Sequence, residues 1–211
     1  MKKQSLLLYA ILGESDIKSQ KSVTEAVKEA IDGGAGIIQL REKHLQGKEL
    51  EERAREVYRL CKEKDIIFLL NDDVELAKKI DCHGVHVGQN DMPPEEAKKI
   101  LGEDKIVGVS VSTVEEAVKA EKNGADYLGV GAVFPTGSKD DALSVSKDTI
   151  KQICESVSIP VVAIGGINAD NMDKLQNMGL SGICVISAIF AKENITLAAK
   201  ELKEKAVKFF G

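Results

Sequence analysis

Short apolar runs alternate along the chain with segments in which apolar residues recur at the spacing of an amphipathic helix. The apolar runs predict eight β-strands at residues 6–12, 36–40, 66–70, 84–87, 105–109, 127–130, 160–164 and 182–186. The periodic segments predict eight helices at residues 19–32, 47–64, 74–79, 93–101, 113–122, 146–157, 170–178 and 192–210. Because the strands are almost wholly apolar and alternate with helices, the pattern indicates a parallel sheet covered on both faces.

Eight strand–helix units within 211 residues favour a closed (β/α)8 barrel, the TIM-barrel architecture of the α/β class. The chain shows no linker or low-complexity segment, so residues 1–211 are predicted to form a single domain. An open doubly wound sheet is the main alternative. No GxGxxG motif follows the first strand, and this counts against a dinucleotide-binding version of that fold.

Composition narrows the classes of function. The net charge of -5 argues against general nucleic-acid binding, although clustered Lys or Arg can still create a local anion site. The four cysteines show neither CxxC nor zinc-site spacing, which suggests free thiols and a cytoplasmic location. The apolar residues 6–12 are interpreted as a buried strand rather than a signal peptide, and no segment is long enough to span a membrane.

Polar residues gather where the predicted strands end. The segments are "QLREK" at 39–43, "NDD" at 71–73, "GQND" at 88–91, Ser110, "GAVFPTGSKDDA" at 131–142, "GGI" at 165–167 and "ISAIF" at 186–190. The loops at the other end of the strands are mainly Gly, Asp and Lys turns. Since a TIM barrel carries its chemistry at the carboxyl ends of its strands, this asymmetry predicts a site there.

Two carboxylates in these segments have two interpretations. Asp72 and Asp91 follow the third and fourth strands, which are neighbours in a barrel, and Mg²⁺ typically takes one or two carboxylates together with substrate phosphates and water. Alternatively, each starts a helix: Asp72 lies three residues before Glu75, as in a capping box, and Asp91 precedes a proline-led first turn. Either stretch alone favours capping, whereas the pair favours a metal.

Cationic and glycine-rich segments predict two sites for anions. Arg41 and Lys43 follow the second strand, and "PTGSK" in the loop after the sixth strand combines hydroxyls, Gly and Lys139. A lone loop lysine is usually only solvated. "GGI" and "ISAIF" after the last two strands are typical of the phosphate site of such barrels, although a tight turn would also need Gly.

The sequence shows no nucleophile with an adjacent base. His44 and His86 have no obvious partner, and neither a Ser-His-Asp nor a Cys-His set is recognisable. We therefore expect a reaction that needs little acid–base chemistry from the protein.

Taken together, these motifs resemble the thiamine-phosphate synthase family. The match runs in order from "QLREK" through "LLNDD", "GVHVGQND", "GVSV", "GADYLGVGAVFPTGSKDDA" and "IPVVAIGGI" to "GICVISAIF", and it covers nearly the whole chain. The resemblance implies condensation of 4-amino-2-methyl-5-hydroxymethylpyrimidine diphosphate with a thiazole phosphate, giving thiamine phosphate and pyrophosphate. It also implies that the pyrimidine diphosphate ionises before the thiazole attacks, and that Mg²⁺ is the cofactor. Oligomeric state stays open.

The resemblance also implies a set of residues for each ligand. The pyrimidine diphosphate set is Gln39, Leu40, Arg41, Glu42, Lys43, Asn71, Ser110 and Lys139. The thiazole phosphate set is Thr136, Gly137, Ser138, Gly166, Ile186 and Ser187. Magnesium would be held by Asp72 and Asp91, and the catalytic roles would fall to Lys139, Ser110, Arg41 and Lys43. Ser138 stands where the family commonly has a second threonine. Asp73 is expected in the first turn of the following helix.

Two other functions remain to be distinguished. A thiazole tautomerase, an isomerase with a similar sequence, would handle the thiazole phosphate alone and would lack the metal carboxylates. A non-catalytic barrel would bind the thiazole phosphate without magnesium-dependent turnover. The presence of Asp72, Asp91, Arg41, Lys43 and Lys139 favours the synthase.

Overall fold

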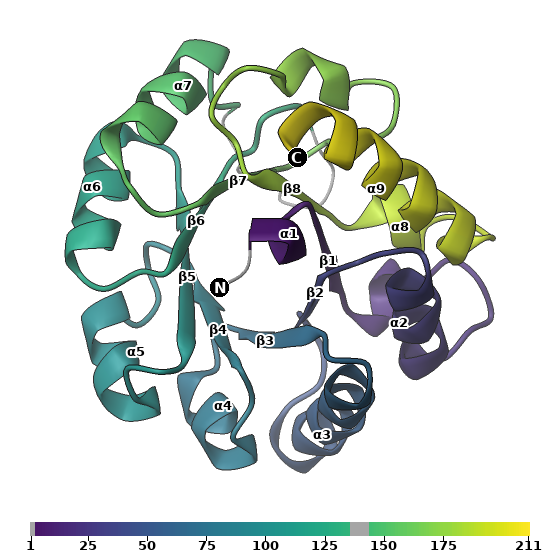
Figure 1. The fold of residues 1–211 in the computed structure, drawn as a ribbon. Helices are drawn as coiled ribbons and strands as arrows, with labels where there is room; N and C mark the ends of the chain where they lie inside the picture. The colour runs from purple at the N-terminus through teal and green to yellow at the C-terminus, as the bar shows by residue number, and fades with distance from the viewer. Residues whose placement is uncertain (1–2, 136–143) are drawn as a thin grey trace.

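A computed structural model describes residues 3–135 and 144–211 and shows a closed barrel of parallel strands surrounded by helices (Figure 1). The strands are β1 (Leu8–Leu12), β2 (Ile37–Leu40), β3 (Ile67–Asn71), β4 (Gly84–Val87), β5 (Ile106–Val111), β6 (Tyr127–Val130), β7 (Val161–Ile164) and β8 (Gly182–Val185). They are ordered as in the sequence, and β8 closes the barrel by pairing with β1. The predicted TIM-barrel fold is thus confirmed.

The helices follow the predicted segments closely. They are α1 (Lys3–Leu6), α2 (Val23–Asp32), α3 (Gly47–Glu63), α4 (Val74–Ile80), α5 (Pro94–Leu101), α6 (Val114–Lys122), α7 (Lys147–Ser156), α8 (Ser187–Phe190) and α9 (Ile195–Phe210), with short 3-10 helices η1 (Glu14–Asp16) and η2 (Met172–Leu175). The short helices α1 and α8 and η1 were not predicted. The strong periodicity of the long helices explains why their positions could be predicted.

The helix predicted at residues 170–178 is wrong, because only η2 forms there. Asn168 and Asn171 explain the difference. The Asp170 N–H donates to Asn168 Oδ1 at 2.8 Å, and the Asn168 N–H donates to Asn171 Oδ1 at 2.9 Å. Side chains of this kind offer the backbone hydrogen bonds that compete with a helix. Asn177 then takes a left-handed backbone with φ 62°, which ends the segment.

The core consists of two apolar regions. The larger lies between the barrel and the helices. The smaller fills the barrel interior and contains Leu6, Tyr9, Ile11, Ile37, Leu69, Tyr127, Val162 and Cys184. Helix α1, which supplies Leu6, lies across the opening of the barrel at the amino ends of the strands (Figure 1). This end is closed by apolar packing, so the carboxyl ends of the strands are where a ligand site is expected.

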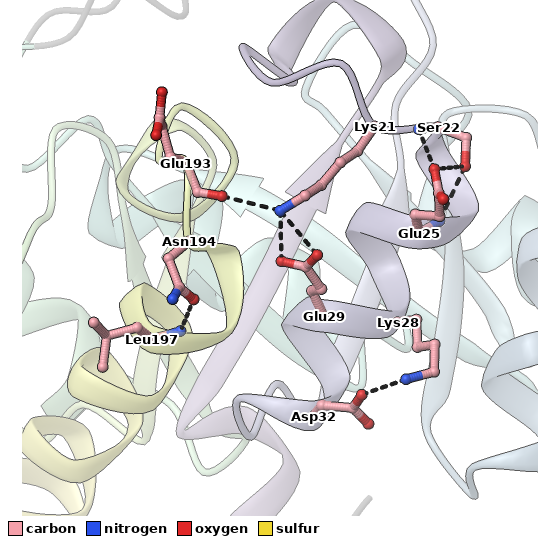
Figure 2. A network of polar contacts seen from close by, with 9 residues as sticks. All are labelled: Lys21, Ser22, Glu25, Lys28, Glu29, Asp32, Glu193, Asn194 and Leu197. Atoms are coloured by element: carbon pink, nitrogen blue, oxygen red, sulfur yellow. Dashed lines mark hydrogen bonds and ion pairs between the residues drawn. The ribbon is translucent and has the colours of Figure 1, made fainter.

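Helices α2 and α9 begin at side-chain caps, and a lysine beside them links the first and last parts of the barrel (Figure 2). Ser22 and Glu25 form a capping box at the start of α2, and Asn194 Oδ1 accepts from the Leu197 N–H at 2.9 Å at the start of α9. Lys21 Nζ lies 2.8 Å from Glu29 Oε1 and donates to the Glu193 carbonyl at 2.9 Å. Lys21 therefore ties the β1–α2 loop to the turn before α9.

Two expectations about the whole chain can be compared with the structure. The four cysteines, Cys61, Cys82, Cys154 and Cys184, are all free, as their spacing predicted. Within residues 3–135 and 144–211, no helix has the length and apolar character needed to cross a membrane.

Candidate active site

The predicted site residues that the structure describes lie at the carboxyl ends of the strands. Gln39 lies near the end of β2 and Asn71 ends β3. Ser110 lies near the end of β5, and Gly166 and Ser187 follow β7 and β8. Because all strands are parallel, these positions face one end of the barrel. Thr136, Gly137, Ser138 and Lys139 lie outside the described residues.

Asp72 and Asp91 lie side by side at this end. The Asp72 N–H donates to the His86 carbonyl at 2.9 Å, so Asp72 extends the pairing of β3 with β4. Burial of the Asp72 carboxyl and the neighbouring Asp91 carboxylate raise the pKa of Asp72 to about 6, and Arg41 acts in the opposite direction. Asp72 is exposed to solvent, and its carboxyl lies within hydrogen-bonding distance of the Asp91 carboxyl.

Helix capping does not explain either carboxylate. The cap of α4 is Asp73, whose Oδ1 accepts from the Leu76 N–H at 2.9 Å, so the expectation of Asp73 within the first turn is wrong by one position. Asp72 has φ 62°, a backbone conformation that non-glycine residues rarely adopt. Asp91 Oδ2 accepts from the Gly88 N–H at 2.8 Å, and α5 begins after Pro93 without a side-chain cap. Both aspartates are therefore free of a capping role.

The donor set suits Mg²⁺ better than a metal held by the protein alone. Within the described part of the chain, no group of three or more His, Cys, Asp or Glu side chains is arranged to hold a metal. Asp72 and Asp91 offer hard oxygen ligands, and Asn71 Nδ2 donates to Asp72 Oδ2 and orients that carboxylate. Mg²⁺ is commonly bound by one or two carboxylates, with phosphates and water completing its shell. The pair fits that pattern, and a cation would relieve the repulsion between them.

The residues at the end of β2 and after it, 40–43, include both packed side chains and side chains available to a ligand. Leu40 packs in the core outside the barrel, and Glu42 is held by Arg53 Nη1 at 3.2 Å and by the Glu14 N–H at 3.1 Å. The Glu42 side chain is only 3% exposed. Arg41 is half-buried beside Asp72, while Lys43 is exposed. Glu42 thus anchors a loop that presents two cations on either side of it.

The segment after β7 packs its backbone closely against the segment after β6. Gly165 and Gly166 have φ values of 97° and 67°, and a Cβ on Gly166 would lie 2.5 Å from the Pro135 carbonyl oxygen. Asn171 Nδ2 donates to the Gly166 carbonyl at 2.9 Å and holds this turn. Helix α8 begins at Ser187, directly after β8 and Ile186. The first N–H groups of a helix have no acceptor within it, so this corner is suited to an anion.

Tyr9 and Tyr127 in the barrel interior escaped the sequence analysis, which named His86 but not its contacts. His86 Nε2 lies 2.9 Å from Ser110 Oγ, and His86 Nδ1 lies 2.7 Å from the hydroxyl of Tyr127. The Tyr127 hydroxyl lies 3.0 Å from that of Tyr9, which accepts from Gln39 Nε2. Burial raises the pKa of both tyrosines well above its usual value, so both stay protonated. Their position within apolar strands was the available signal, because a buried hydroxyl needs a partner.

Comparisons with known proteins agree on one family. Residues 8–189 match the sequence profile of the family described as thiamine monophosphate synthase. A thiamine-phosphate synthase of Clostridium beijerinckii is 46% identical over 198 residues, which are 94% of this chain and 95% of that protein. One from Methanobrevibacter smithii is 41% identical over 202 residues, 96% of each chain. The solved structure of a thiamine phosphate pyrophosphorylase from Pyrococcus furiosus is 42% identical, covers 99% of both chains and superposes with a TM-score of 0.90.

Proposed function

Since this chain belongs to the thiamine monophosphate synthase family and is an enzyme of the transferase class, we propose that it condenses a hydroxymethylpyrimidine diphosphate with a thiazole phosphate. The products would be thiamine phosphate and pyrophosphate. One observation carries this proposal: the carboxylates of Asp72 and Asp91 meet at the carboxyl ends of β3 and β4, and neither caps a helix. Such a pair suits a magnesium ion shared with a diphosphate.

The residues around Asp72 and Asp91 are suited to stabilising a pyrophosphate leaving group. Arg41 lies close enough to Asp72 to affect its pKa, and Lys43 is two residues further along the same loop. Magnesium would supply positive charge that neutralises the leaving pyrophosphate. Arg41 and Lys43 would hold the same oxygens, and Lys139, which the resemblance adds, would act with them. Asn71 and Ser110 would orient the pyrimidine diphosphate from β3 and β5.

The reaction requires little proton transfer by the protein. The bond between the pyrimidine methylene carbon and the diphosphate oxygen breaks, and its electron pair leaves with pyrophosphate. The thiazole nitrogen then donates its lone pair to the resulting carbocation and forms the new C–N bond. The protein must hold the two substrates in line and stabilise the developing charges. Cationic and hydroxyl side chains at the strand ends agree with this division of tasks.

The thiazole phosphate would bind on the other side of the barrel mouth. The turn at Gly165 and Gly166 and the start of α8, where Ser187 follows Ile186, offer backbone N–H groups there. Thr136, Gly137 and Ser138 are proposed from the resemblance alone. Two separate anion sites fit two phosphorylated substrates, whereas an isomerase acting on the thiazole phosphate would need only this one.

The decisive assay supplies purified protein with both substrates and Mg²⁺ and measures pyrophosphate release together with thiamine phosphate. We expect both products in equal amounts. Absence of both would refute the synthase. Omission of the pyrimidine diphosphate separates the alternatives: an isomerase would still convert the thiazole phosphate, and a non-catalytic barrel would bind it without turnover.

A further inference from the structure

A chain of hydrogen bonds crosses the barrel interior and joins two of the proposed substrate-binding residues. It starts at Gln39 on β2, passes through the hydroxyls of Tyr9 on β1 and Tyr127 on β6, and reaches His86 on β4 and Ser110 on β5. The two tyrosine hydroxyls are 3.0 Å apart, the Tyr127 hydroxyl is 2.7 Å from His86 Nδ1, and His86 Nε2 is 2.9 Å from Ser110 Oγ. This chain of hydrogen bonds links five strands, so no local sequence pattern would reveal it.

Gln39 ends the chain with an acceptor that lacks a partner. The residue is 1% exposed, and its Oε1 has no hydrogen-bond partner among the described residues. Its Nε2 is already used, because it donates to the Tyr9 hydroxyl. A buried carbonyl oxygen without a donor is costly, so its presence at the carboxyl end of a TIM-barrel strand indicates a ligand that donates a hydrogen bond.

The direction of each hydrogen bond follows from the first. Since the Tyr9 hydroxyl accepts from Gln39, its own proton goes to Tyr127, and the Tyr127 proton goes to His86 Nδ1. His86 then carries its proton on Nε2 and donates it to Ser110 Oγ. The Ser110 hydroxyl keeps its own proton for another acceptor. Turning the Gln39 amide round would reverse every one of these bonds, so the two ends of the chain are coupled.

From this coupling we infer that Tyr9, Tyr127 and His86 are positioning residues that make Gln39 an acceptor and Ser110 a donor toward the bound pyrimidine diphosphate. The inference rests on the proposed function. An amide oxygen facing the substrate matches the ring amino group of an aminopyrimidine, which donates N–H. The analogue with a ring carbonyl in place of that amino group would put two acceptors together. The chain of hydrogen bonds therefore selects the amino pyrimidine over the oxo pyrimidine.

Removal of a single hydroxyl tests the inference. Tyr127→Phe and Tyr9→Phe keep the rings but interrupt the chain. We measure kcat/KM for the amino pyrimidine diphosphate and for its oxo analogue, with saturating thiazole phosphate. Wild-type protein should prefer the amino form by about 100-fold or more, because a site built to hydrogen-bond a substrate group rejects an analogue without it. Each variant should reduce this preference by about tenfold, which corresponds to one neutral hydrogen bond.

Tyr58→Phe is the matched control. Its hydroxyl lies on α3, outside the barrel, and donates to the Asp81 carbonyl at 3.0 Å. This variant should keep the wild-type preference. An unchanged preference in Tyr127→Phe and Tyr9→Phe, or an equal loss of turnover with both substrates, overturns the inference. Equal use of both substrates by wild-type protein overturns it without any variant. Failure of wild-type protein to turn over either substrate refutes the proposed function instead.

Discussion

Substitution of neighbouring aspartates separates metal binding from helix capping. Asp91→Asn removes a charge from the pair with Asp72 but keeps an oxygen that can accept from the Gly88 N–H. Asp73→Ala removes the cap of α4, in which Oδ1 accepts from the Leu76 N–H. We expect Asp91→Asn to raise the Mg²⁺ concentration for half-maximal turnover and Asp73→Ala to lower the melting temperature. Asp91→Asn should leave the melting temperature unchanged, and Asp73→Ala should leave the Mg²⁺ requirement unchanged.

The magnitudes follow from the contacts. Loss of an N-cap costs about 1 kcal/mol, which lowers the melting temperature of a domain of this size by about 2–4 °C. Asp91→Asn should change stability by less than about 0.5 kcal/mol, because the loop hydrogen bond survives and repulsion with Asp72 disappears. Its Mg²⁺ midpoint should rise about tenfold or more, because even outer partners of metal ligands contribute that much to affinity.

The assay combines a melting curve without ligands and a Mg²⁺ titration of pyrophosphate release at saturating substrates. The reasoning is refuted if Asp91→Asn melts several degrees lower while its Mg²⁺ midpoint stays at the wild-type value. It is also refuted if Asp73→Ala raises that midpoint, since Asp73 would then belong to the metal site.

Three further predictions address other parts of the site. Arg53→Met should raise the KM for the pyrimidine diphosphate about fivefold, because Glu42 loses its contact with Arg53, which contributes about 1 kcal/mol. Arg55→Met is the control, since the exposed Arg55 side chain pairs with Glu51. An unchanged KM in Arg53→Met, or an equal rise in Arg55→Met, would contradict this prediction. Gly166→Ala should raise the KM for the thiazole phosphate, because its Cβ would meet the Pro135 carbonyl at 2.5 Å; a rise confined to the pyrimidine diphosphate would show the turn belongs elsewhere. EDTA should abolish turnover but shift the ligand-free melting temperature by under about 1 °C, because two carboxylates need the diphosphate to complete the metal shell; a larger shift would indicate a resident structural ion.

The order of elements was readable from the sequence because it depends on local periodicity. Apolar runs and helical spacing located all eight strands and most helices within a few residues. The one wrong long helix, at residues 170–178, failed where Asn side chains compete for backbone hydrogen bonds. Asp73 was expected in the first turn of α4 but is its N-cap, because Asp72 and Asp73 are equally good caps until the path of the chain is known.

The candidate site was predictable to the extent that it follows strand ends. Asp72 and Asp91 were expected near each other because β3 and β4 are neighbours in a barrel, and the structure brings them together. The role of Glu42 was not predictable, since its partner Arg53 lies on α3 and the direction of its side chain depends on packing. The contacts of His86 were invisible for the same reason.

By itself, the sequence determined the succession of strands and helices, the parallel sheet and the polar ends of the strands, because these depend on periodicity and on the chirality of the connections. Tertiary structure decided which side chains meet across the barrel. Five strands supply the hydrogen-bonded residues Gln39, Tyr9, Tyr127, His86 and Ser110. Their contacts depend on the register of each strand and on the inward orientation of each side chain. Those quantities are set by closure of the whole barrel, when β8 pairs with β1, and not by any segment of the chain.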